Sequence, residues 1–280
     1  MLTLSDLQKS GVLPLWLCVG GGALVKVGLF RNSPNHLRRS TLFPVCFLPG
    51  GFLVHEFDNI FSDLFLHDSA LYRNIVSALV SDDKDAQEIC AILDIPQTGR
   101  LSGCLEELRL AGFVTRDYTW NIKSGLDTKL SRYRLSDAYI RFYLKYIEPN
   151  RTRIDRGMFT TKTVTALPAW QAIMGLQFEN LILHNRHLIH EALHLRPEDI
   201  VSENPFFQYT TAKQPGCQID YMIQTRFNSL YVCEIKFSQN IVGESIIEEV
   251  QQKIDRLCRP RAYSVRPVLI HVNGVSDGVE

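Results

Sequence analysis

The stretch that most constrains the fold is LYVCEIKF, residues 230–237, which places two charged side chains inside an otherwise apolar segment. Its length and composition predict a strand of a well-covered sheet, where an unpaired carboxylate or ammonium costs free energy. Successive side chains of a strand alternate between its two faces, so Glu234 and Lys236 fall on the same face. The stretch therefore predicts a polar site on one face of a sheet.

A second carboxylate precedes this strand. QIDYMIQ and SLYVCEIKFS predict two strands joined by a short turn, which allows Asp220 to lie beside Glu234 and Lys236. Two carboxylates about 4 Å apart repel by roughly 4 kcal/mol at an effective dielectric constant near 20, and a divalent cation between them reverses that sign. Mg²⁺ suits such a site, with Mn²⁺ as the alternative, because it takes oxygen ligands from one or two carboxylates and keeps several waters. Lys236 is then expected to position the attacking water and to offset charge on a phosphate.

The order of elements around this pair is helix, strand, strand, helix, strand. A long helix is expected from Trp170, with Glu179 near the edge of its buried face, and a later helix and strand follow the pair. The same long helix carries four histidines, which are expected to form a partly solvated face because no second cluster completes a zinc site. They are His184, His187, His190 and His194.

Residues 69–135 predict three helices followed by two strands, the order of a winged helix-turn-helix. The third helix offers Arg100 and Arg109 to DNA but also Glu106 and Glu107, which would lie close to phosphates. The two strands are better supplied for backbone contact, and a packing or protein-contact role is the alternative. Their basic residues are Arg116, Lys123, Lys129, Arg132 and Arg134.

An aromatic stripe follows at helical spacing, and it predicts a linker helix over residues 137–157 that packs into the core. Its N-cap is expected at Ser136 or Asp137. The stripe consists of Tyr139, Phe142, Tyr143 and Tyr146.

The N-terminal residues 1–65 predict short helices broken by glycine and proline, with residues 42–51 as a loop. The apolar residues 11–30 resemble a membrane segment, but three consecutive glycines and Lys26 interrupt them. We therefore expect no membrane span.

The formal net charge is zero, so nucleic-acid contact has to come from local basic patches. One such patch lies in residues 253–266, where five basic residues outnumber Asp255: Lys253, Arg256, Arg259, Arg261 and Arg266. The seven cysteines are odd in number and have no C-x-x-C pair, which predicts free thiols in a reducing cytoplasm.

The residues ID at 219–220 and EIK at 234–236, separated by thirteen residues and preceded by a helical Glu179, resemble the PD-(D/E)xK restriction-endonuclease-like superfamily. The resemblance implies that Asp220 and Glu234 bind the metal, that Lys236 acts in catalysis and that Glu179 supports the site. It also implies a polar active-site role for Gln251 or Gln252. An ordinary strand with a cross-strand salt bridge is the structural alternative.

A wider resemblance covers nearly all of the chain. LCVGGGALVKVGLF, GFVTR, YRLSDAYIRFYLKYIEPN, LQFENLI and CEIKFS are similar, in this order, to the C-terminal two-thirds of a prokaryotic AAA+ (DEXX-box) ATPase family that ends in an endonuclease-like domain of unknown function. It implies a multidomain α+β protein. Its expected parts are a helical ATPase-lid-like segment (1–65), a winged helix-turn-helix (66–136), a linker helix (137–157) and an α/β PD-(D/E)xK nuclease-like domain (158–280).

The chain departs from that family because it has no G-x-x-x-x-G-K-[ST] motif, and VGGGALVK does not replace it. ATP is therefore not expected to bind this chain alone, and a split or shortened gene product is expected. The leading hypothesis is a cytoplasmic DNA-binding protein that acts as a Mg²⁺-dependent DNA endonuclease. The alternatives are a non-catalytic DNA- or protein-binding regulatory module, or the C-terminal half of a split ATPase that self-associates or is completed by a separately encoded P-loop chain.

Overall fold

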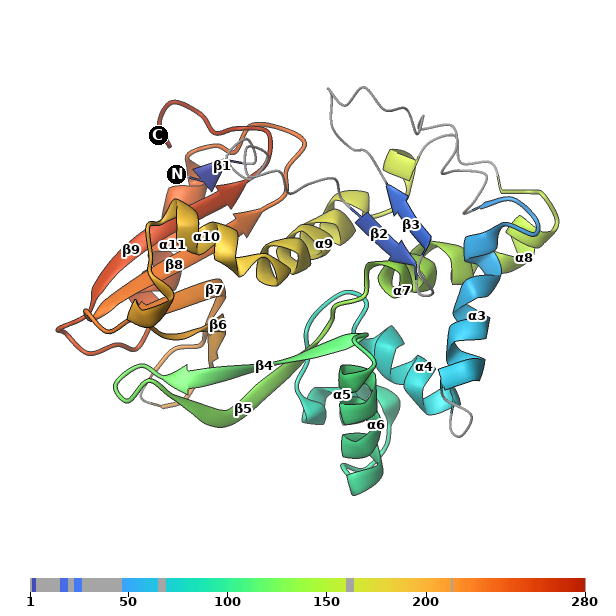
Figure 1. The fold of residues 1–280 in the computed structure, drawn as a ribbon, viewed down its shortest axis with the longest axis horizontal. Coiled ribbons are helices and arrows are strands. Elements are labelled where there is room, and N and C mark those ends of the chain that lie inside the picture. Colours follow the sequence, from blue (N-terminus) through green and yellow to red (C-terminus); the bar gives the residue numbers. More distant parts are fainter. Residues whose placement is uncertain are drawn as a thin grey trace. The chain divides into compact units, whose positions relative to one another are not determined.

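The computed structural model describes residues 2–3, 16–19, 23–26, 47–64, 69–159, 164–212 and 214–279. The chain is a mixed α+β protein (Figure 1) that divides into two compact units. The first unit joins Asp117–Ser131 and Met174–Glu280 with the short strand β1, and the second joins Arg132–Ile173 with the described part of Leu13–Arg116.

The first unit is built on a mixed five-stranded sheet in the order β1-β9-β8-β7-β6. Strands β6, β7 and β8 are antiparallel neighbours, whereas β9 runs parallel to both β8 and β1. The strands are β1 (Leu2–Thr3), β6 (Ile200–Gln208), β7 (Cys217–Thr225), β8 (Ser229–Lys236) and β9 (Ser264–His271). The predicted β7–β8 hairpin and the predicted strand β9 are thus confirmed.

Strand β6 was not predicted. Its sequence IVSENPFFQ mixes polar residues and a proline with apolar ones, which hides the period-two pattern of a strand. The ladder to β7 shifts register twice, between Ile200 and Ser202 and between Asn204 and Phe206. Such irregularities absorb residues that would otherwise break the alternation.

The long helix expected from Trp170 is two helices, so this prediction was wrong in its length. Helix α9 (Trp170–His184) ends before Asn185, whose backbone at φ −120° and ψ 39° is not helical, and α10 (Arg186–Ala192) follows. The Asn185 side chain donates a hydrogen bond to the Leu181 carbonyl at 2.8 Å. This bond satisfies one of the carbonyls that a helix end leaves open. The later helix is confirmed as α11 (Ser245–Arg256).

The predicted three helices lie in the second unit, and the two predicted strands that follow them are divided between the two units. Leu101, Leu105 and Leu108 are buried as the helical spacing indicates. The elements are α4 (Ser69–Ala78), α5 (Ala86–Leu93), α6 (Gly99–Leu110), β4 (Val114–Asn121) and β5 (Leu126–Leu135). The tip of the β4–β5 hairpin, Asp117–Ser131, belongs to the first unit. Assignment of these elements to a winged helix stays a prediction.

The aromatic stripe after β5 is core, as predicted, because Tyr139, Phe142, Tyr143 and Tyr146 are all buried. Asp137 caps the first turn by accepting a hydrogen bond from the Ile140 amide at 2.7 Å. The segment runs through α7 (Ala138–Phe142), a π-helical turn (Tyr143–Ile147) and α8 (Arg151–Asp155).

The N-terminal part differs from its prediction where it is described. Instead of short helices, β2 (Trp16–Val19) and β3 (Ala23–Lys26) form an antiparallel pair, and only then does helix α3 (Phe52–Leu64) follow. Of the loop expected over residues 42–51, residues 42–46 lie outside the described residues, and residues 48–51 are not helix or strand. Among the described residues, none of the helices combines the length and the apolar composition that a membrane crossing requires.

Candidate functional site

Asp220 and Glu234 face each other across the β7–β8 ladder. Tyr221 pairs with Cys233 in that register, and Asp220 and Glu234 are the next residues along the two antiparallel strands. The Glu234 carboxylate is buried, with 3% of its side chain exposed. Asp220 Oδ2 accepts a hydrogen bond from the Ile235 amide at 2.8 Å, which fixes the orientation of its carboxylate. The sequence prediction that the two acids meet is confirmed.

A lysine from α11 joins the two acids. Lys253 Nζ donates to Asp220 Oδ1 at 3.3 Å and also to Glu234 Oε2. Ile246 and Val250 are buried, and Lys253 follows them at helical spacing on the same face. The sequence assigned Lys253 to DNA backbone contact, but the structure places its ammonium in the carboxylate cluster.

Lys236 lies at the other side of Glu234. Its Nζ is 3.1 Å from Glu234 Oε1 and 3.0 Å from Glu249 Oε2 on α11. The predicted trio of Asp220, Glu234 and Lys236 is therefore linked through Glu234, and Glu249 extends it. Sequence reasoning missed Glu249, although its position four residues before Lys253 puts both on one side of α11.

The charges in this cluster shift one another's pKa values. Burial raises the pKa of Asp220, and the neighbouring Glu234 charge raises it further, while Lys253 opposes both effects. Burial alone would lower the pKa of Lys236 and of Lys253, but the carboxylates outweigh it and leave both values raised. Both ammonium groups are thus strongly held in the charged form.

The donor set suits a hard cation, because an Asp220 oxygen and a Glu234 oxygen already converge on one ammonium. Within the described ranges there is no group of three or more His, Cys, Asp or Glu side chains arranged to hold a metal ion. The protein would therefore contribute two carboxylates, and water or phosphate oxygens would complete the coordination.

Glu179 lies half-buried on α9, and its supporting role stays a prediction. Gln251, one of two glutamines with a predicted site role, donates to Asp255 at 2.7 Å.

The four histidines of α9, α10 and the turn after α10 are exposed, as expected, with one exception. His184, His187 and His194 are exposed, whereas His190 packs against the sheet. His190 Nε2 lies 2.5 Å from Glu203 Oε2 and 3.2 Å from the Tyr221 hydroxyl. This is a hydrogen-bonded anchor between α10 and strands β6 and β7.

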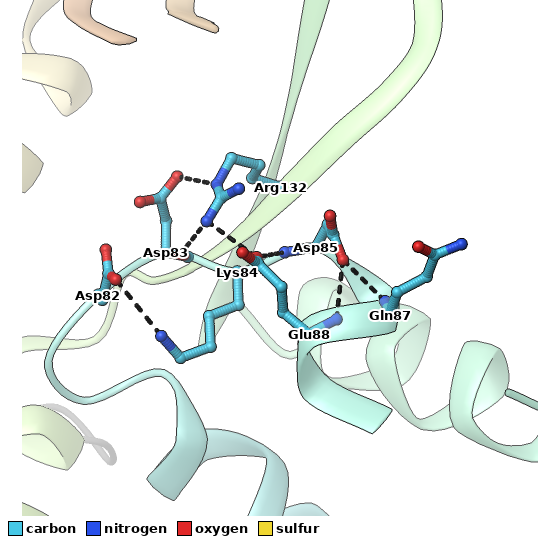
Figure 2. A network of polar contacts seen from close by, with 7 residues as sticks. All are labelled: Asp82, Asp83, Lys84, Asp85, Gln87, Glu88 and Arg132. Atoms are coloured by element: carbon cyan, nitrogen blue, oxygen red, sulfur yellow. Dashed lines mark hydrogen bonds and ion pairs between the residues drawn. The ribbon is translucent and has the colours of Figure 1, made fainter. Parts of the chain in front are cut away.

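Some of the basic residues assigned to DNA are buried or contact other side chains, and the others are exposed. Arg134 is 5% exposed, so its predicted contact with a DNA backbone was wrong. Figure 2 shows Arg132 in a polar network, with its Nε 2.7 Å from Asp83 Oδ2 and Nη2 2.9 Å from Glu88 Oε2. The Arg116 guanidinium lies 5.3 Å from the Tyr133 ring centroid.

The remaining predicted residues are exposed, and their DNA contact stays a prediction: Lys123, Lys129, Arg256 and Arg259.

Comparison with known proteins adds one relative. The chain is 27% identical over 130 residues to an uncharacterized protein of Methanocaldococcus jannaschii, and the match covers 46% of this chain and 28% of that protein. No family model and no solved structure matches the chain. The fold and the site therefore carry the functional argument.

Proposed function

We propose that this protein is a Mg²⁺-dependent DNA phosphodiesterase that acts as an endonuclease through Asp220, Glu234 and Lys236. The observation that carries the proposal is the position of the Lys253 ammonium, which contacts both carboxylates at once. Two acids that share one cation are spaced to share another, and a second amine, Lys236, is 3.1 Å from the same Glu234.

Bound Mg²⁺ supplies Lewis acidity and lowers the pKa of a coordinated water. Asp220 and Glu234 would hold the ion, and the hydrogen bond from the Ile235 amide fixes the orientation of the Asp220 carboxylate. Lys236 would orient the attacking water and offset charge on the scissile phosphate. Lys253 contacts the same two carboxylates, so its ammonium would be available to a phosphate if it were displaced from them.

DNA is the substrate class that the local charge favours. The chain has no net charge, yet residues 253–266 carry five basic residues against one acid, and four of the five remain once Lys253 is assigned to the carboxylate cluster. Such a patch attracts a phosphate backbone without requiring a basic protein. Arg256 and Arg259 are its exposed candidates, and Lys123 and Lys129 on the β4–β5 hairpin are exposed as well.

Cleavage of a supercoiled plasmid in the presence of Mg²⁺ tests the proposal. Glu234→Gln keeps the shape of the side chain but removes its charge, and it should lower the nicking rate by about 100-fold or more, as removal of one electrostatic catalytic group typically does. Lys236→Met should have a comparable effect. Glu248→Gln is the matched control, because Glu248 is exposed on α11 and should leave nicking unchanged. Equal nicking by Glu234→Gln and the wild type would refute the assignment.

A second candidate is a non-catalytic module that binds DNA or a protein partner. The observation in its favour is that Lys253 and Lys236 already neutralise both carboxylates, so the cluster is satisfied as a buried salt-bridge network. Calorimetric titration with Mg²⁺ and Mn²⁺ separates the two candidates. DNA binding that persists without any metal binding would support the module.

An ATPase role would require a P-loop that this chain lacks, supplied by a separately encoded chain. Stable association of the purified protein with a P-loop ATPase, with ATP hydrolysis only in the mixture, would support that role. Self-association is tested by the mass of the protein in solution.

A further inference from the structure

A cavity of about 550 Å³ lies in the first unit, between the tip of the β4–β5 hairpin, the end of β6 and the loop after α11. Its volume is in the range of small-ligand sites. The charged residues in its lining are Lys123 and Arg259, both cations. The other notable feature is a set of aromatic rings: Trp120, Phe206, Phe207 and Tyr209. Aromatic surface combined with positive charge suits a ligand that has both a planar ring and an anionic group.

Two of the aromatic lining residues are packed together and buried. The rings of Trp120 and Phe206 meet edge to face with centroids 5.1 Å apart, and both are buried. Trp120 Nε1 donates to Gln224 Oε1 at 2.6 Å, and Gln224 in turn donates to the Ile122 carbonyl at 2.9 Å. These bonds hold the hairpin tip to strand β7 and so support the aromatic side of the cavity.

One ring of the cavity is open to solvent. Tyr209 is 38% exposed and stands edge-on to Phe207, with centroids 6.0 Å apart. A half-exposed ring supported by a buried one offers a face on which a planar group can stack.

One lining residue ties the cavity to the elements that carry the carboxylate cluster. Gln208, one of its lining residues, donates to the Arg256 carbonyl at 2.8 Å and accepts from the Cys258 amide at 3.0 Å, which ties the end of β6 to the end of α11. Gln208 also pairs with Cys217 on β7. Asp220 lies three residues further along β7, a distance of about 10 Å at the usual rise of a strand. This distance is about three times the rise per nucleotide along one strand of DNA.

We propose that this cavity binds one nucleotide of a single-stranded DNA segment next to the cleavage site, which makes single-stranded or locally unpaired DNA the substrate. The base would stack on Tyr209, and Lys123 and Arg259 would hold the adjoining phosphates. A base paired within a duplex does not present its face, so a concave aromatic cavity selects an unpaired strand. The inference rests on the proposed phosphodiesterase function, because that function supplies the reason for DNA to lie here.

Binding measured without cleavage tests the inference. Fluorescence anisotropy in a chelator-containing buffer follows a labelled oligothymidylate of about a dozen nucleotides, near the upper site sizes known for single-strand binders. Tyr209→Ala, and separately the double variant Lys123→Ala/Arg259→Ala, should each weaken binding by about tenfold or more. Tyr209→Phe should retain affinity. Phe227→Ala is the matched control, since Phe227 is 63% exposed, lies in the same unit and is outside the cavity.

Competition experiments distinguish a nucleotide within a DNA strand from a free nucleotide. Unlabelled oligothymidylate should displace the probe, whereas a duplex of equal length and thymidine monophosphate should compete far more weakly. Unchanged affinity in Tyr209→Ala, or equal competition by the duplex, would overturn the inference. Equal competition by the mononucleotide would assign the cavity to a free nucleotide and overturn the single-strand part.

The two proposals can fail separately. If the wild type never nicks DNA but binds the oligonucleotide through Tyr209, the phosphodiesterase assignment fails and the cavity remains a single-strand site. If Glu234→Gln abolishes nicking while the cavity variants bind and cut normally, the inference about the cavity fails alone.

Discussion

Lys253 Nζ lies 3.3 Å from Oδ1 of Asp220, although the two residues are 33 positions apart in the sequence. The same ammonium donates to Glu234, so one partly exposed cation holds the buried Glu234 carboxylate and the partly buried Asp220 carboxylate together. Under the proposed function, a divalent ion that enters this cluster would have to replace that ammonium. Metal binding would then be linked to the stability of the first unit through Lys253 and Asp220.

Lys253→Met should separate these two effects. Without metal, the variant leaves two facing carboxylates without their bridging cation, and the free energy of unfolding should fall by about 1 to 3 kcal/mol, discounted from the cost of a fully buried pair because the lysine is partly exposed. With Mg²⁺ the loss should be recovered, because the ion replaces the ammonium. Thermal unfolding with and without Mg²⁺ measures both quantities. A Mg²⁺-induced shift in Tm no larger than that of the wild type would contradict the prediction.

The stabilising effect of Mg²⁺ should grow with pH. Burial raises the pKa of Asp220 above its usual 3.8, so in the metal-free protein this group's contribution to stability is complete below pH 3.8 and is lost as pH rises through the raised value. If Mg²⁺ binds the ionised carboxylate as proposed, it should reverse that loss over the same window. Urea unfolding across this pH range, with and without Mg²⁺, measures the difference. In Asp220→Asn the contribution of this group should be absent, and a wild-type-like pH dependence in that variant would assign the effect elsewhere.

Gly125→Ala should loosen the hairpin tip from the sheet. Gly125 has φ +70°, and a Cβ there would lie 2.5 Å from Val201 Cγ1 on β6. The Gly125 carbonyl also accepts a hydrogen bond from the Ser202 hydroxyl at 2.7 Å, which the displacement would strain. We expect a loss of about 1 to 3 kcal/mol in the free energy of unfolding, measured by urea denaturation.

Gly274→Ala is the control for that variant. Gly274 has φ +87° but no atom within 4 Å of an added Cβ, so it carries the backbone cost alone. Gly125→Ala should be the more damaging change. Equal losses in the two variants would show that the contact with Val201 does not matter.

Arg132→Ala should reduce stability rather than specifically weaken DNA binding. Its guanidinium contacts Asp83 and Glu88 in the network of Figure 2, and burial raises the pKa of Asp83 against the opposing effect of Arg132. Removal of the arginine should lower the free energy of unfolding by about 1 to 3 kcal/mol. Lys129→Ala, an exposed change on the same strand, should stay within about 0.5 kcal/mol.

The same two variants distinguish a structural role of a basic residue from a role in DNA contact. Lys129→Ala should weaken DNA binding and reduce its salt dependence, as the loss of one phosphate contact does. Arg132→Ala, measured under conditions in which it is fully folded, should bind DNA with the same affinity as the wild type. The opposite pattern would return Arg132 to the DNA-binding surface.

The sequence was most informative where structure follows from local periodicity. Alternation along residues 230–237 placed Glu234 and Lys236 on one face, and helical spacing buried Leu101, Leu105 and Leu108. It was least informative where polar residues interrupt an element, as in β6, or where a helix stops at a residue such as Asn185 that also occurs within helices. These outcomes depend on contacts that only the folded chain supplies.

The chain by itself determined which residues share a strand face or a helix stripe, because those relations follow from the backbone geometry of each element alone. Only the tertiary structure decided that Lys253 reaches Asp220 and Glu234, that Glu249 reaches Lys236, and that Arg134 is buried. The reason is physical. Long flexible side chains take the partner that packing brings within reach, and the packing of α11 on its sheet involves residues far apart in the sequence.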